Sequence, residues 1–79
     1  MQEGKAKSYL ITPKNDESFT VRAHTYQEAA RIGSNRMHGR NATAKRTTGD
    51  PGKSGYFQSY KHVRGENALS SVGEPFHVS

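Results

Sequence analysis

The chain has 79 residues, 30% of them hydrophobic, and its 12 lysines and arginines against 7 acidic residues give a formal net charge of +5 and a sequence pI near 9.8. So short a chain is expected to form one domain, residues 1–79, with a thin core. The absence of cysteine excludes disulfides and thiolate metal sites, and no segment resembles a signal peptide or a membrane span, so we expect a soluble protein of the cell interior.

The start of the chain predicts an antiparallel hairpin. Residues 1–5 are polar and expected to be flexible. Residues 6–12 and 17–23 alternate between apolar and polar side chains, as strands do, and residues 13–16 between them are turn formers. The face of this hairpin expected to turn toward the core carries Tyr9, Ile11, Phe19, Val21 and Ala23.

A helix is predicted from Thr25 to about Met37. Thr25 and Glu28 have the spacing of a capping box, in which the threonine hydroxyl accepts from the Glu28 N–H and the Glu28 carboxylate accepts from the Thr25 N–H. Gly39 is a suitable end, since glycine adopts the conformation that closes a helix. The stripe expected to pack on a sheet is Tyr26, Ala29, Ala30, Ile32, Gly33 and Met37. The opposite, exposed face is expected to carry Gln27, Glu28, Arg31, Ser34, Asn35 and Arg36.

The second half of the chain predicts more strands around a long loop. Residues 40–48 alternate weakly and residues 56–63 strongly, and the glycine-rich residues 49–55 between them form a loop. In the aromatic strand, Phe57 is expected in the core. The other face of that strand carries Tyr56, Gln58, Tyr60 and His62.

The end of the chain completes the expected sheet. Residues 64–67 predict a turn, residues 68–72 a short strand, residues 73–75 a further turn and residues 76–78 a terminal strand. The fold class is therefore α+β: a single antiparallel β-sheet of four to five strands with one α-helix packed on one face. The helix follows the second strand, and we expect a monomer.

Residues 52–54 read Gly-Lys-Ser, which also ends the phosphate-binding loop of P-loop proteins. That loop needs a glycine five positions earlier, where this chain has Thr47, and a helix after it, where an aromatic strand is expected. The four histidines lack metal-ligand spacing, and no serine, histidine and acid suggest a catalytic set. We therefore expect a hairpin loop here, no cofactor, no metal and no enzymatic activity.

Basic residues, with tyrosines between them, form the remaining candidate site. Such a pattern contacts phosphates and stacks on bases. It also occurs on ordinary solvated surfaces and near helix C-termini, so nucleic acid, an acidic protein face and a solvated surface all stay open. The candidate partner-binding residues are Arg31, Asn35, Arg36, Arg40, Lys45, Arg46, Lys53, Tyr60, Lys61 and Arg64.

Short blocks along the chain resemble a known family. In the first hairpin they are Tyr9-Leu10-Ile11, Pro13, Glu17, Phe19-Thr20-Val21 and Ala23. The more specific block comprises Ser54-Gly55, Phe57-Gln58, Tyr60, His62, Gly65, Asn67, Val72-Gly73 and Pro75-Phe76-His77-Val78. With these blocks the chain resembles small phage anti-CRISPR proteins that inhibit type I (Cascade) surveillance complexes, most closely those first associated with subtype I-E. Residues 28–32 also look like a helix of another small, basic type I inhibitor.

The resemblance implies a stoichiometric inhibitor that acts in the cytoplasm of the infected bacterial host, binds a Cascade complex and blocks target DNA binding. Because a chain of net charge +5 does not imitate DNA, docking on the backbone subunits beside the guide RNA is expected, with non-specific duplex DNA as a further contact. The subtype (I-C, I-E or I-F) and the subunit contacted stay open. The alternatives are a small basic nucleic-acid-binding module without a protein target and a phage structural or interaction protein.

Overall fold

The computed structural model describes residues 5–62 and 68–79, and these form an α+β fold with five strands and one helix. The fold class predicted from the sequence is confirmed. The elements are β1 (Lys7–Thr12), β2 (Phe19–Ala23), α1 (Tyr26–His38), β3 (Thr43–Arg46), β4 (Gly55–His62) and β5 (Leu69–Val78). α1, the one helix in this described part of the chain, is neither long nor apolar enough to cross a membrane.

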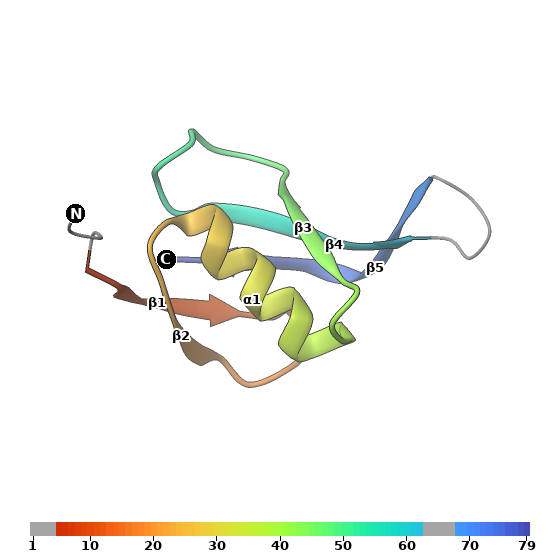
Figure 1. Ribbon diagram of the computed structural model, residues 1–79, viewed down its shortest axis with the longest axis horizontal. Helices are drawn as coiled ribbons and strands as arrows, with labels where there is room; N and C mark the ends of the chain where they lie inside the picture. Colours follow the sequence, from red (N-terminus) through yellow and green to blue (C-terminus); the bar gives the residue numbers. More distant parts are fainter. Residues whose placement is uncertain (1–4, 63–67) are drawn as a thin grey trace.

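The strands form one antiparallel sheet in the order β2-β1-β5-β4-β3. β5, the last strand, is therefore at the centre of the sheet, where it pairs with β1 from the start of the chain on one side and with β4 on the other. Ile11 of β1 lies opposite Val78 of β5, and Leu10 and Ser79 exchange two backbone hydrogen bonds of 2.8 and 3.0 Å. As Figure 1 shows, α1 crosses one face of the sheet and leaves the other face uncovered.

The core lies between α1 and the sheet. Phe57 and Phe76 are 0% and 1% exposed, and their rings stack with centroids 6.2 Å apart. The helix side contributes small residues, so α1 lies close to the sheet: a Cβ at Gly33 would meet side-chain carbons of Ile11 at 3.3 Å. The predicted inward residues Tyr9, Ile11, Val21 and Ala23 are buried, and Phe19 is partly buried.

The helix begins at the predicted residue, with one difference in the capping network. The Thr25 hydroxyl accepts from the Glu28 N–H at 3.0 Å, as expected. The Glu28 carboxylate reaches one residue further back than predicted: its Oε1 accepts from the backbone N–H of His24 at 2.7 Å and lies 3.2 Å from the His24 ring. At the other end, Gly39 has a φ of +104° and its N–H donates to the Asn35 carbonyl, which ends α1 as predicted.

Replacing Thr25 by alanine is expected to lower the free energy of unfolding by about 1 kcal/mol, because the Glu28 N–H then loses its acceptor. Urea denaturation followed by circular dichroism measures the loss. Thr25→Ser keeps the hydroxyl and serves as the control, with stability close to the parent. Equal stability of the alanine variant and the parent would contradict a capping role.

The Glu28 carboxylate also predicts a pH dependence. The hydrogen bond from the His24 backbone N–H, followed by the contacts with the His24 ring and with Arg31, holds the pKa of Glu28 below its ordinary value. A carboxyl whose pKa is lowered by folding contributes stability above its unfolded pKa and loses it as pH falls through the folded pKa. As the pH falls from 7 to about 3, the melting temperature of the parent should therefore decrease by more than that of Glu28→Gln. Glu17→Gln, in an exposed turn, is the control and should follow the parent.

Ser34, which the helical pattern placed on the exposed face, is fully buried. The exposed assignment was wrong because α1 sits so close to β4 that one more helix position faces the sheet. Its hydroxyl lies 2.7 Å from the hydroxyl of Ser59, which is also fully buried. One hydroxyl donates to the other, so neither oxygen lacks a hydrogen-bond partner and the pair avoids the cost of about 1–3 kcal/mol that a buried unpaired hydroxyl carries.

Two strand predictions need correction. Residues 73–75 do not separate two strands: β5 runs without a break from Leu69 to Val78, with an irregular register opposite Phe57 and Ser59. Gly73, at a φ of +68°, takes up the extra length there, and the Gln58 side-chain amide donates to the Gly73 carbonyl at 3.1 Å. Pairing with β4 on both sides of residues 73–75 thus overrides the local turn preference. β3 is shorter than the predicted residues 40–48, and the turn predicted at residues 64–67 lies outside the described residues, as do residues 1–4.

Candidate functional site

The predicted basic site divides between the two faces of the sheet. Residues alternate in direction along a strand, so Tyr60 and Lys61, neighbours in sequence, point to opposite sides. Tyr60 lies on the face without the helix, which we call the open face, and Lys61 lies on the helix side, where its Nζ is 3.9 Å from the position of a Cβ at Gly39. The expected site of basic residues with tyrosines between them is therefore divided into two groups, one on each face of the sheet.

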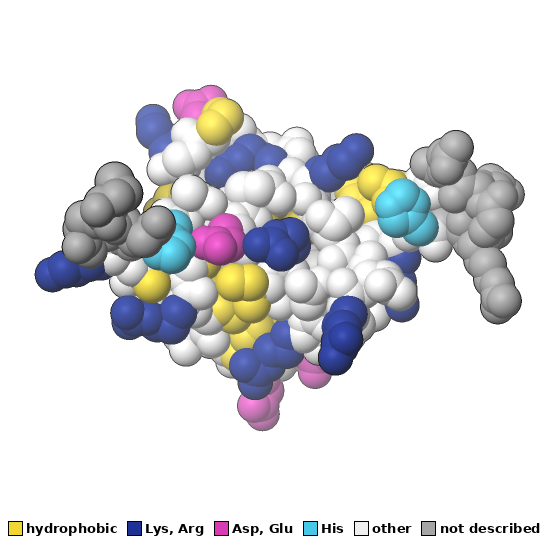
Figure 2. All heavy atoms as spheres, viewed as in Figure 1, with side chains coloured by type: hydrophobic (Ala, Val, Ile, Leu, Met, Phe, Trp, Pro, Cys, Tyr) yellow, Lys and Arg dark blue, Asp and Glu magenta, His cyan; other side chains and the backbone are white. Residues whose placement is uncertain are grey.

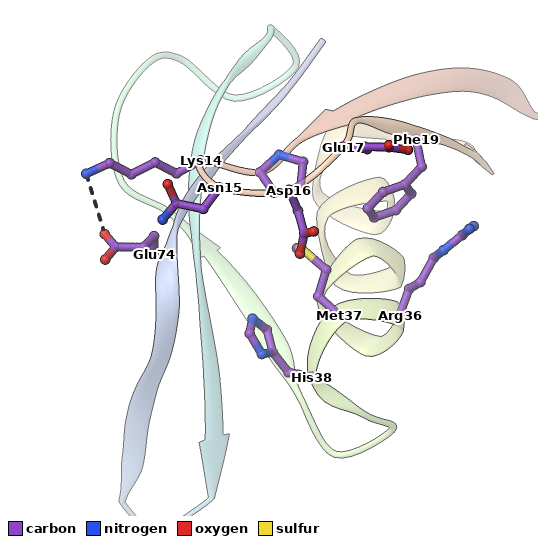
Figure 3. A pocket seen from close by; sticks show the side chains of 10 residues that line it. Lys14, Asn15, Asp16, Glu17, Phe19, Arg36, Met37, His38 and Glu74 are labelled. Carbon is purple, nitrogen blue, oxygen red and sulfur yellow. Dashed lines mark ion pairs between the residues drawn. The ribbon is translucent and has the colours of Figure 1, made fainter.

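On the helix side, Arg31 and Arg36 are exposed and each has a contact of its own. The Arg31 guanidinium lies 3.9 Å from a carboxylate oxygen of Glu28, one turn earlier on α1. The Arg36 guanidinium lies over the Phe19 ring, 4.5 Å from its centroid, and Figure 3 shows the two side chains next to each other. Arg40 follows in the exposed turn after α1. All three arginines present charge to solvent, and the Arg36 side chain also covers the Phe19 ring.

Asn35 is half-buried, although the helical pattern placed it on the exposed face. With its amide nitrogen turned toward the backbone, Asn35 donates to the carbonyls of Arg40, at 3.2 Å, and Ala42. These bonds hold the connection between α1 and β3. The described geometry gives Asn35 a role inside the chain, and a role in partner binding stays a prediction.

Arg46 has a similar inward role. Its guanidinium lies over the Phe57 ring at 4.7 Å, its Nη2 donates to the Lys53 carbonyl at 2.8 Å, and its Nη1 donates to the Thr48 carbonyl at 3.4 Å. A Cβ at Gly55 would collide with this guanidinium. Arg46 therefore closes the loop between β3 and β4 over the end of the core, which is a different use of its charge from the contact with a partner that the sequence suggested.

The remaining predicted residues lie apart from one another. Lys53 is exposed in the loop between β3 and β4, where its Nζ lies 3.9 Å from an exposed Asp50 carboxylate. Lys45 is exposed on the open face, and its Nζ lies 5.7 Å from the centroid of the Tyr60 ring. Arg64 lies outside the described residues. Figure 2 shows the helix side of the molecule with its lysines and arginines scattered over the face and rim, with no single basic patch.

A cavity of about 550 Å³ opens between the β1–β2 turn and the C-terminal end of α1. Figure 3 shows that side chains of both charge signs surround it, with Lys14 and Glu74 paired at 3.8 Å. Its further lining residues are Pro13, Asn15, Asp16, Glu17, Phe19, Arg36, Met37 and His38. Among residues 5–62 and 68–79, no three histidine or acidic side chains come together as ligands for a metal ion.

The open face also holds two rings, Tyr56 and His77, that are not among the candidate partner-binding residues. Tyr56 of β4 lies directly opposite His77 of β5, and their rings meet edge to face with centroids 4.9 Å apart. The alternation of β4 already separated Tyr56 from the core residue Phe57. The partner His77 becomes visible only with the strand register, which no local pattern gives.

No protein-family model matches the chain, and no curated protein matches its sequence.

Proposed function

We propose that this chain is an anti-CRISPR protein: a stoichiometric inhibitor that binds a type I Cascade complex and blocks its binding to target DNA. It acts in the cytoplasm of the infected bacterial host. It docks on backbone subunits beside the guide RNA and occludes the path of the target strand. Its surplus cations also attract duplex DNA without sequence preference.

One observation carries the proposal: the residues of the family resemblance, which lie far apart in sequence, are neighbours in the fold. Phe57 and Phe76, from the more specific block, stack in the core. Ile11, from the first block, lies opposite Val78, from the last. The blocks that carry the resemblance thus meet in one sheet and one core, and the proposal rests on that resemblance.

The distribution of charge supports docking beside nucleic acid. The chain has a net charge of +5, and Arg31, Arg36 and Arg40 present cations on and beside the exposed surface of α1. An acidic imitation of DNA is excluded by that sign. A basic surface is instead attracted to acidic protein and to the phosphates of a guide RNA beside it. It can also lie against neutral protein without repulsion.

The proposal is tested by mixing the purified, tagged chain with purified I-C, I-E and I-F Cascade complexes. We expect co-elution with one of them in size-exclusion chromatography, at a fixed stoichiometry and at moderate salt. In a gel-shift assay, binding of that complex to its target duplex should fall as the chain approaches the amount needed to saturate the complex.

The two parts of the proposal fail in different ways. If none of the three complexes retains the chain, Cascade inhibition is wrong for these subtypes. If a complex retains the chain and still binds its target duplex, the block of DNA binding is wrong, and the inhibited step lies later, at recruitment or action of the nuclease. A cleavage assay with the same components separates these results.

A further inference from the structure

The open face of the sheet exposes aromatic side chains. Tyr56 is 50% exposed, although tyrosines in strands mostly pack against neighbours. Its edge-to-face contact with His77 fixes the ring and leaves part of it free to solvent. Tyr60, on the same face of β4, is half-buried and lies four residues away, a separation of about 13 Å along a strand. The face therefore offers two tyrosine rings held by the sheet.

Next to Tyr56 the surface is hollowed. A shallow cavity of about 400 Å³ is lined by the Tyr56 and His77 rings, together with Thr12 and Pro75. Lys14 stands at its margin, with its Nζ 3.8 Å from the exposed Glu74 carboxylate. An aromatic wall with a lysine at the rim suits a planar, uncharged ring attached to an anionic group, which describes a nucleotide.

The charged residues at the described strand positions of this face have one sign. Arg22 and Lys45 are exposed on β2 and β3, on opposite sides of the tyrosines in the strand order. The Lys45 Nζ lies over the Tyr60 ring, 5.7 Å from its centroid, so a base that stacks on this ring would have a cation next to it. None of the described acidic residues occupies an open-face strand position. Glu74 of β5 lines the cavity between the β1–β2 turn and α1, where its carboxylate lies 3.8 Å from the Lys14 Nζ, and Figure 3 shows this pair across the cavity from Arg36.

We propose that the open face binds single-stranded nucleic acid, with bases stacked on Tyr56 and Tyr60 and phosphates contacted by Lys45 and Arg22. Aromatic rings fixed on a sheet, with cations around them, bind unpaired bases of any sequence, because every base has a π-face. Paired bases keep their faces stacked inside the duplex, so this surface discriminates against duplex DNA. The inference does not rest on Cascade inhibition, which uses a protein partner and was argued from other residues.

The experiment measures fluorescence anisotropy of labelled oligonucleotides of about 12 nucleotides, as single-stranded DNA, single-stranded RNA and duplex, at about 50 mM salt. We expect a single strand to bind at least tenfold more tightly than the duplex. Tyr56→Ala and Tyr60→Ala should each weaken single-strand binding by about tenfold. Tyr56→Phe keeps the ring and should bind as the parent does.

Two further readouts separate stacking from charge. The chain has no tryptophan, so its emission comes from four tyrosines, and single-strand binding should lower that emission in the parent. Lys45→Gln should weaken binding and reduce the salt dependence, whereas Lys7→Gln removes an equal charge from the helix side of β1 and should leave the affinity nearly unchanged. Melting temperatures confirm that each variant is folded.

Three results would overturn the inference. They are the absence of single-strand binding, equal affinity for single strand and duplex, and unchanged affinity in both tyrosine-to-alanine variants. If those variants keep their nucleic-acid affinity and lose capture by a Cascade complex, the open face is a protein-docking surface. The anisotropy assay contains no Cascade, so its failure leaves the inhibitor proposal standing, and failure of the Cascade assay leaves this inference standing.

Discussion

Replacing Phe57 by alanine is expected to lower the free energy of unfolding by about 3–5 kcal/mol, the typical loss for a buried phenylalanine. Phe57 is 0% exposed, its ring stacks on Phe76, and the Arg46 guanidinium covers its other side. It also stands on β4, which pairs with strands on both sides. A domain of this size has a total stability of about 4–12 kcal/mol, so the loss is a large part of it. The variant should be substantially unfolded at 37 °C.

Urea denaturation and thermal melting, both followed by circular dichroism, measure this loss. Tyr56→Ala is the matched control: it removes an aromatic ring from the neighbouring position of the same strand, where the side chain is 50% exposed and faces the other way. Its expected loss is limited to the contact with His77, about 1 kcal/mol. Equal losses in the two variants, or a parent-like melting temperature for Phe57→Ala, would contradict the assignment of Phe57 to the core.

The local patterns of the sequence were sufficient for the element types and for most strand faces. Strand alternation placed Phe57 inside and Tyr56 outside, since the side-chain period of a strand does not depend on its partners. The cap at Thr25 and the end at Gly39 were predictable for the same reason. Features that depend on distant partners were not predictable. Nothing near Ser34 in sequence points to Ser59, its hydrogen-bond partner 25 residues away.

The course of β5 shows how long-range pairing overrides a local signal. Residues 73–75 contain glycine and proline and predict a turn. In the fold, β4 supplies partners for residues 69–72 and 76–78, and residues 73–75 between them are absorbed as an irregularity that includes Gly73. Propensity decides a segment's structure only where no neighbouring strand competes for its backbone hydrogen bonds.

For the candidate site, the sequence pattern selected cations and tyrosines and missed their separation on two faces of the sheet. Arg46 was counted with the partner-binding cations, but its guanidinium packs over the Phe57 ring and donates hydrogen bonds to carbonyls of the adjacent loop. Lys45, next to it, points to the opposite face and lies beside Tyr60. Two adjacent cations thus belong to different surfaces. A count of charges along the chain contains no information on which of them the fold uses internally.

Reversing the charge of Arg31 and Arg36 together, as Glu, is expected to weaken binding to the Cascade complex by at least tenfold. Both arginines are exposed on α1, and a reversed charge at an interface adds repulsion to the loss of attraction, at a cost of several kcal/mol. The Arg36 contact with Phe19 contributes about 0.5–1 kcal/mol to stability, so the double variant should melt slightly below the parent and remain folded.

The control for this variant is Lys5→Glu with Lys7→Glu, at an exposed end of β1 that is not a candidate site. Each reversal changes the charge by 2, so both double variants go from +5 to +1 (5 − 4 = 1) and differ only in where the charge is lost.

The helix variant should lose inhibition of target-DNA binding by Cascade, and the control should keep most of it. If both lose it equally, net charge alone attracts the partner. If both inhibit as the parent does, the arginines of α1 form a solvated surface and the docking contacts lie elsewhere. We expect the helix variant and the control to differ because salt screens charges that lie more than about 10 Å from the partner. Docking then depends on where a charge lies and not on the net charge.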